Sequence, residues 1–169
     1  LGQWPVSLAP GMSWGEAEQQ ILARLPDVVS EIVAQCVTDT LLRTPQPPGA
    51  GEYEPPYHGE HAWIDWSCPF EEIARMCLAT RPKTGALTAL DGRRQCIWSV
   101  GLAEGLDAGS AAPGTILHLD AAGRPVVACG LEQGLTIEQI VAYGAVRDSR
   151  GWRDFVPGRR FRVAAGGRS

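Results

Sequence analysis

The stretch TILHLDAAGRPVVAC, residues 115–129, decides the fold class that we expect for this chain. Two apolar runs flank the polar turn at residues 120–123, and Gly123 can adopt the left-handed backbone conformation that a short hairpin loop needs. A short loop joins antiparallel strands, whereas parallel strands need a long crossover connection. The stretch therefore predicts an antiparallel hairpin with strands at residues 115–119 and 124–129.

Further strands are predicted on both sides of this hairpin. Apolar and polar residues alternate over residues 61–66 and 95–102, which is the period of a half-buried strand. The run Phe161-Arg162-Val163 predicts a final edge strand. Residues 81–94 show neither the helical nor the strand period, so we expect a loop there.

Two helices are predicted near the start of the chain. Ser13 and Glu16 have the spacing of a capping box, which marks the start of a helix. Pro26 has no backbone N–H and is expected to break or kink that helix. A broad apolar stripe then predicts a second helix over residues 28–43, packed in the core.

Two short helices are predicted later in the chain. Pro69 suits the first position of a helix that runs to about residue 78. Thr136 and Gln139 resemble a second capping box and predict a helix to about residue 143. The order of elements therefore predicts an α+β fold, in which an N-terminal helical pair packs on a mostly antiparallel sheet with two further short helices.

The chain is expected to form one domain with a flanking segment at each end. Its length of 169 residues fits a single domain. We expect an extended arm at residues 1–12, an α+β domain at 13–146 and an Arg-rich tail at 147–169. Five prolines and three glycines make residues 44–60 a long, exposed loop within that domain. Because the first residue is Leu, the sequence fits either a fragment or a start at a non-standard codon.

Composition argues against a membrane protein and against a general nucleic-acid binder. No apolar run approaches the ~20 residues of a membrane helix. Residues 1–146 hold 8 basic and 17 acidic side chains, a net charge of −9, whereas residues 147–169 hold 7 arginines and 2 aspartates, a net charge of +5. The 5 cysteines are odd in number and form no C-x-x-C pair, which fits reduced thiols in the cytoplasm.

One polar cluster, in the segment before the third predicted helix, has side chains suited to catalysis or metal binding. Cys68 would lie at the helix start, where a thiolate is favoured, with His61 or His58 as its base and Asp65 as the orienting group. A metal site of His58, Glu60, His61 and Cys68 is the alternative. The spacing matches no metal motif, so a structural or solvated cluster is the preferred interpretation.

No cofactor is predicted. The sequence contains neither a G-x-x-x-x-G-K-[ST] loop nor a G-x-G-x-x-G segment after a strand, which are the usual phosphate-binding loops. It also lacks the G-x-S-x-G turn that presents a nucleophilic serine.

Tryptophans and arginines outside the periodic segments are the expected contacts with protein partners. Trp4 and Trp152 lie in segments without periodicity, and Trp is enriched at interface hot spots. The arginines are either solvated or docked on an acidic protein surface, and the interspersed Asp148 and Asp154 disfavour nucleic acid as a partner. The expected partner-binding residues are Trp4, Trp152, Arg153, Arg159, Arg160 and Arg162.

These features favour a non-enzymatic structural or assembly subunit of a larger, oligomeric protein complex. We expect a phage virion component, at the head-to-tail connection or in the tail, located in the cytoplasm or in a virion assembled there. The first alternative is a cysteine-dependent hydrolase or transferase that uses Cys68 with His61 or His58. The second is a regulatory module that binds nucleic acid through the tail at residues 147–169.

Overall fold

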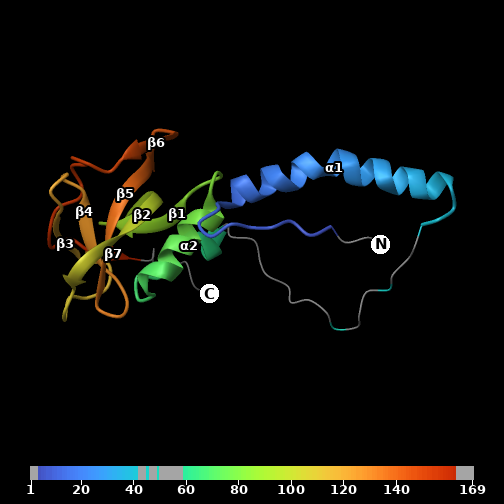
Figure 1. Ribbon diagram of the computed structural model, residues 1–169. Helices are drawn as coiled ribbons and strands as arrows, with labels where there is room; N and C mark the ends of the chain where they lie inside the picture. The colour runs from blue at the N-terminus through green and yellow to red at the C-terminus, as the bar shows by residue number, and fades with distance from the viewer. Residues whose placement is uncertain (1–3, 42–44, 46–48, 50–58, 163–169) are drawn as a thin grey trace. The chain divides into compact units, whose positions relative to one another are not determined.

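The computed structural model describes residues 4–41, 45, 49 and 59–162, and the chain divides into two compact units. The helical unit is Leu1–Pro55 and the sheet unit is Pro56–Ser169. Figure 1 shows a long helix in the first and a curled sheet with a shorter helix in the second. The elements are α1 (Trp14–Val37), η1 (Gly59–Ala62), α2 (Phe70–Thr80), β1 (Ala86–Leu90), β2 (Arg93–Asp107), β3 (Ile116–Leu119), β4 (Pro125–Ala128), β5 (Gln133–Ala142), β6 (Ala145–Asp148) and β7 (Phe161–Arg162).

The helical unit is built on α1, which starts where the sequence predicts. The Ser13 hydroxyl accepts a hydrogen bond from the Glu16 amide at 3.4 Å, and the Ser13 amide donates to the Glu16 carboxylate at 2.7 Å, so the capping box is confirmed. Pro26 lies inside the helix rather than at its end. Because a proline ring holds φ near its helical value, the helix loses a hydrogen bond there but continues. The prediction of two separate helices is therefore wrong.

The apolar stripe of α1 is exposed. Ala17 is the one buried residue of this helix, and Val37 is 81% exposed. The second half of α1, predicted to be a core helix, therefore buries none of its apolar side chains. The exposed large apolar residues of α1 are Trp14, Ile21, Leu22, Leu25, Val29, Val33 and Val37.

The segment before α1 runs alongside that helix. The indole N–H of Trp4 donates to the Glu31 carboxylate at 3.3 Å, and the Arg24 guanidinium donates to the Pro5 carbonyl at 2.6 Å. Trp4 thus contacts its own helix, and its role in binding a partner stays a prediction.

In its described residues, the sheet unit contains seven antiparallel strands. They lie in the order β3-β4-β5-β2-β1-β7, and β6 also pairs with β5. The predicted hairpin is confirmed as β3 and β4, with Gly123 at a φ of +79° in the turn between them. The long β2 and β5 form the central pair of the sheet.

The segment that ends in β7 connects the two edges of the sheet. β7 pairs with β1, and on the other side the amide of Ile116 in β3 donates to the Arg159 carbonyl at 2.8 Å. The amide of Gly158 donates to the Ile116 carbonyl and the amide of Phe161 to the Gly114 carbonyl, both at 2.8 Å. These bonds satisfy backbone groups that an open sheet edge would expose, and they keep the sheet curled.

The core of the sheet unit lies inside this curl, and α2 packs against β2. The Phe161 ring stacks on Trp66 with 5.2 Å between centroids and meets Phe155 edge-on at 5.5 Å. The buried indole N–H of Trp66 donates to the Thr88 hydroxyl at 2.9 Å, so this polar atom is satisfied. The largest fully buried aliphatic side chains are Ile64, Ile73, Leu90, Ile97, Ile116, Leu135, Ile137 and Ile140.

The predicted α+β fold, with a helical pair packed on the sheet and four helices in all, is wrong. The described residues contain two α-helices and a curled antiparallel sheet. Residues 136–143, predicted as a helix, belong largely to β5, whose pairing with β2 and β4 buries Leu135 and Ile137. β-Branched residues suit a strand, and this long-range pairing outweighs the local capping pattern.

Two shorter assignments also change. Residues 81–94, predicted as a loop, contain β1, and residues 61–66, predicted as a strand, contain the end of η1 and a single bridge between Trp63 and Leu87. The predicted helix after Pro69, the strand at residues 95–102 and the short strand at residue 161 are confirmed as α2, β2 and β7.

Among the described helices, none combines the length and apolar character that crossing a bilayer requires.

Candidate nucleic-acid interface

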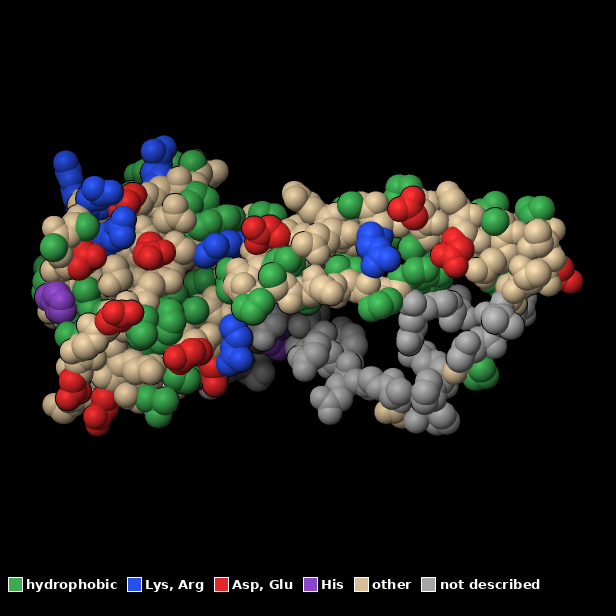
Figure 2. All heavy atoms as spheres, viewed as in Figure 1, with side chains coloured by type: hydrophobic (Ala, Val, Ile, Leu, Met, Phe, Trp, Pro, Cys, Tyr) green, Lys and Arg blue, Asp and Glu red, His purple; other side chains and the backbone are tan. Residues whose placement is uncertain are grey.

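Four arginines gather on the surface of the sheet unit around β6. Arg147 lies on β6, Arg150 and Arg153 follow it, and Arg124 lies directly before β4. Figure 2 shows Lys and Arg side chains gathered over this part of the unit. We call this surface the β6 patch, and its residues are Asp120, Arg124, Tyr143, Arg147, Asp148, Arg150, Trp152 and Arg153.

Backbone contacts fix the segment after β6. The Ser149 amide donates to the Glu138 carbonyl at 2.9 Å, and the buried Ser149 hydroxyl donates to the Ile137 carbonyl. The Gly151 amide donates to the Gly123 carbonyl at 3.4 Å. These contacts hold this segment beside the β3–β4 turn, so arginines that are distant in sequence come together.

Asp148 links two of the four arginines. Its Oδ2 atom lies 3.0 Å from the Arg150 guanidinium and 3.3 Å from that of Arg124. Hydrogen bonds, first from Arg150 and then from Arg124, hold the pKa of the Asp148 carboxyl well below its usual range, so it is ionised at neutral pH. With Asp120 attracting Arg150 as well, the patch has four positive and two negative side chains and keeps a net charge of +2.

The other two arginines of the patch are available to a ligand. Arg147 and Arg153 are exposed, and neither forms an ion pair with any residue that the structure describes. The guanidinium fork matches the geometry of phosphate oxygens and stays charged. Contacts of this kind position proteins on nucleic acids, so Arg147 and Arg153 are the candidate phosphate ligands of the patch.

Two aromatic rings lie in the same patch. Tyr143, in the turn between β5 and β6, is 92% exposed, and its ring centroid lies 6.4 Å from that of Trp152. Trp152 is half-buried and also packs against the core of the sheet unit. The sequence predicted a partner-binding role for Trp152 and Arg153, and the structure brings these two residues together with the rest of the patch.

The remaining predicted partner-binding arginines lie in the segment that closes the sheet. Arg159 pairs with Asp91 at 3.0 Å, and the Arg160 Nε donates to the Pro113 carbonyl at 2.9 Å. Arg162 lies in β7 and is exposed. A cavity of about 310 Å³ beside Arg159 has two arginines and two aspartates in its wall, so it is electrically balanced. Its lining residues are Leu90, Asp91, Arg93, Asp154 and Arg159.

The predicted polar cluster forms the turn that leads into α2. His58 and the side chain of Glu60 lie outside the described residues, and His61 is exposed in η1. One oxygen of Asp65 accepts a hydrogen bond from the Ser67 amide at 3.0 Å, as in an Asx turn. Within the described residues, no group of three or more His, Cys, Asp or Glu side chains is arranged to hold a metal ion.

Cys68 lies in a tightly packed backbone contact. Its thiol is half-buried, and its carbonyl accepts from the Gly130 amide at 2.9 Å. A Cβ atom at Gly130 would lie 2.1 Å from the Ser67 carbonyl oxygen, so only glycine permits this approach. The residue that caps α2 is Pro69, so Cys68 lies one residue before the cap. These contacts give the segment a structural role, and the catalytic role of Cys68 stays a prediction.

Three of the other thiols are kept protonated by their surroundings. Burial raises the pKa of Cys77 to about 12 and that of Cys129 to about 11. Burial also raises the pKa of the half-buried Cys96. Because the thiolate is the nucleophile, these thiols are poorly reactive at neutral pH.

We expect iodoacetamide at about pH 7.5 to label Cys36 and to leave Cys77 and Cys129 unmodified in the folded chain. Cys36 is exposed on α1, whereas a raised pKa and burial keep the other two thiols protonated and covered. Peptide mass mapping measures the labelling, and unfolding in urea should make all three sites react. Rapid labelling of Cys77 in the folded chain would contradict this assignment.

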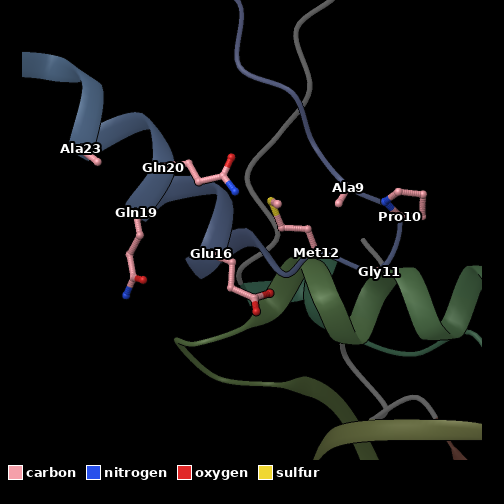
Figure 3. Close-up of a pocket in the computed structure, with 8 residues that line it drawn as sticks. All are labelled: Ala9, Pro10, Gly11, Met12, Glu16, Gln19, Gln20 and Ala23. Carbon is pink, nitrogen blue, oxygen red and sulfur yellow. The ribbon is translucent and has the colours of Figure 1, made fainter. Parts of the chain in front are cut away.

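The helical unit contains a cavity of about 580 Å³ between α1 and the segment before it (Figure 3). Among the described residues that line it, the one ionisable side chain is Glu16, whose carboxylate is engaged in the capping box. General acid–base or nucleophilic catalysis needs a second reactive group nearby. This cavity is therefore not a candidate active site.

The sheet unit also carries the similarity to known proteins. Residues 58–146 match the sequence model of the family described as formyl transferase, C-terminal domain, which is more than half of the chain. The chain belongs to this family. Among the described residues, the formyl transferase C-terminal domain thus comprises η1, α2, the strands β1 to β5 and the start of β6, which the match enters as far as residue 146.

Relatives of this formyl transferase C-terminal domain are methionyl-tRNA formyltransferases. The protein of Chromobacterium violaceum is 32% identical over 150 residues, which is 85% of this chain and 46% of that protein. The protein of Burkholderia ambifaria is 34% identical over 163 residues, 87% of this chain and 48% of that protein. The protein of Variovorax paradoxus is 36% identical over 109 residues, 63% of this chain and 34% of that protein. The chain thus spans between a third and a half of the length of these curated relatives.

These similarities overturn the function predicted from the sequence. A structural subunit of a virion is wrong, because the family and the relatives are formyltransferases. The cysteine-dependent alternative has no support in the comparisons either. The expectation that nucleic acid is a disfavoured partner is also wrong, since the relatives are named for a transfer RNA, and nothing supports an oligomeric protein assembly.

The sequence reasoning missed six of the eight residues of the β6 patch. Arg124, Tyr143, Arg147 and Arg150 were not among the predicted site residues, although the spacing of three between Arg147, Arg150 and Arg153 was visible. The link from Arg124 to Asp148 depends on the folded β3–β4 turn, so no local pattern could reveal it.

Proposed function

We propose that this chain is the RNA-binding C-terminal part of an enzyme that transfers a formyl group to methionyl-tRNA. The family and the names of the relatives support the reaction and the substrate. The observation that carries the binding role is the β6 patch, a positive surface whose exposed Arg147 and Arg153 have no ion-pair partner among the described residues. In this proposal the two guanidinium groups contact phosphates of the tRNA backbone.

The chemical step would take place outside the described residues. Each of these curated relatives is at least twice as long as the segment that matches, so more than half of each relative has no counterpart in this chain. The proposed role of the sheet unit is therefore to hold the substrate, not to transfer the formyl group. A tRNA substrate is compatible with the cytoplasmic location that the sequence analysis expects.

The salt dependence of tRNA binding tests this function. We expect the 169-residue chain to bind labelled initiator tRNA, as measured by fluorescence anisotropy. If the guanidinium groups of Arg147 and Arg153 each make one phosphate contact, affinity should fall roughly 10-fold between about 50 mM and about 200 mM salt, because each contact releases a bound counterion. No binding at the lower salt concentration would contradict the proposal.

A further inference from the structure

The turn between β5 and β6 carries a residue that its geometry disfavours. Ala142 pairs with Ala145, so Tyr143 and Gly144 alone form the turn. Their φ angles are +51° and +74°, the pattern of a type I′ turn. Asn-Gly is the strongly preferred pair for this turn, whereas a bulky residue such as Tyr is strained at positive φ.

The side chain of Tyr143 contributes little to the stability of the fold that would offset this strain. Its side chain is 92% exposed, so it buries almost no apolar surface. Its one ring contact within the described residues is with Trp152. Strained residues that persist without a structural benefit are concentrated at binding sites, so the exposed Tyr143 ring is a candidate contact with a ligand.

Trp152 has a feature that core packing does not explain. Its indole Nε1 is buried and has no hydrogen-bond acceptor among the described residues. A phenylalanine would pack against the core without leaving a buried donor unpaired. Compared with phenylalanine, tryptophan has a wider ring face. Part of the half-buried Trp152 ring lies beside Tyr143.

The two rings lie slightly closer together than a flat aromatic ligand between them would need. Their centroids lie 6.4 Å apart with 51° between the ring planes. A planar group between two parallel rings needs about 7 Å, twice the contact distance of about 3.5 Å between carbon atoms. Because Tyr143 is exposed, its side chain can move away from Trp152 to widen this spacing, and its ring can rotate toward the parallel orientation, both at little cost.

The charges around the two rings identify the class of ligand. Arg153 follows Trp152 directly, and Arg147 lies on the strand that starts after the Tyr143-Gly144 turn. Aromatic faces combined with arginines are the usual means by which proteins bind unpaired nucleotides, the rings stacking on bases and the guanidinium groups contacting phosphates. We propose that Tyr143 and Trp152 form a stacking site for an unpaired nucleobase of the bound RNA. The identity of the RNA as a tRNA rests on the proposed function.

Replacing Tyr143 by the residue that the turn prefers separates a binding role from a structural one. We expect Tyr143→Asn to weaken tRNA binding about 5- to 100-fold, the usual effect of removing one stacked base contact. The melting temperature should stay unchanged or rise, because Asn suits the left-handed turn position. The salt slope should also be unchanged, because no charge is removed. Tyr143→Phe, which keeps the ring, should bind within about twofold of the original chain.

Two results would overturn the stacking site while leaving the proposed function intact. One is a Tyr143→Asn variant that binds tRNA as tightly as the original chain. The other is a loss of binding accompanied by a lower melting temperature, which would show that Tyr143 acts through the fold.

A second measurement keeps the stacking site testable if the chain fails to bind tRNA. A single-stranded oligoadenylate should quench the tryptophan fluorescence of the chain, and the quenching should disappear in Trp152→Phe and in Tyr143→Asn. Quenching without tRNA binding would retain the stacking site and reject the proposed function. The absence of both would reject both.

Discussion

Reversing the charges of Arg147 and Arg153 together, as Arg147→Glu with Arg153→Glu, should remove most of the affinity of this chain for tRNA. Each side chain is exposed and has no ion-pair partner among the described residues, so each is free to contact a phosphate. A hydrogen bond to a charged group contributes about 1.5 kcal/mol or more, so losing two should weaken binding roughly 100-fold. Anisotropy titration with labelled tRNA at fixed salt measures this loss, and circular dichroism checks that the variant is folded.

A second double variant makes the same change in net charge elsewhere on the sheet unit. Arg75 lies on α2 and Lys83 follows that helix, and both are exposed and outside the β6 patch. Arg75→Glu with Lys83→Glu should weaken binding only a few-fold, because salt screens charges more than about 10 Å from the ligand. Equal losses in the two double variants would mean that overall charge, and not the β6 patch, determines binding.

The sequence predicts an element of the fold when the residues that define the element lie within it. Gly123 and the capping box of Ser13 with Glu16 lie within the elements that they define, so the β3–β4 hairpin and the start of α1 could be predicted. β5 carries a capping-box pattern, yet it is a strand because β2 and β4 pair with it from distant parts of the chain. Pro26 suggests a break or a kink between two helices, yet one helix continues through it.

The candidate site shows the same limit. Composition revealed the arginines of residues 147–169, and their charge made them candidate contacts with a binding partner. Composition could not reveal that Asp148 engages Arg124 and Arg150 and leaves Arg147 and Arg153 free. It also could not place Tyr143 beside Trp152, because that contact forms only when β6 folds back on β5.

The segment after β6 also has an architectural role that its Arg-rich composition conceals. Ser149, Phe155 and Phe161 are all buried, although their spacing follows neither a helix nor a strand. Phe161 contacts the Trp66 and Phe155 rings, and its amide bonds to the Gly114 carbonyl next to the start of β3. The segment therefore fixes the curl of the sheet, and its anchoring in turn fixes the arginines of the β6 patch.

Truncating this anchor should destabilise the sheet unit more than any other change considered for this chain. Phe161 is 1% exposed, and Phe161→Ala should lower the free energy of unfolding by about 3–5 kcal/mol through lost burial and the cavity that remains. Val156→Ala provides the matched control, because Val156 lies in the same segment but is 43% exposed and should change stability by less than about 0.5 kcal/mol. Urea unfolding followed by circular dichroism compares the two. A loss below about 1 kcal/mol for Phe161→Ala would show that the curled sheet holds without its closing segment, and the arginine surface would then need another explanation for its order.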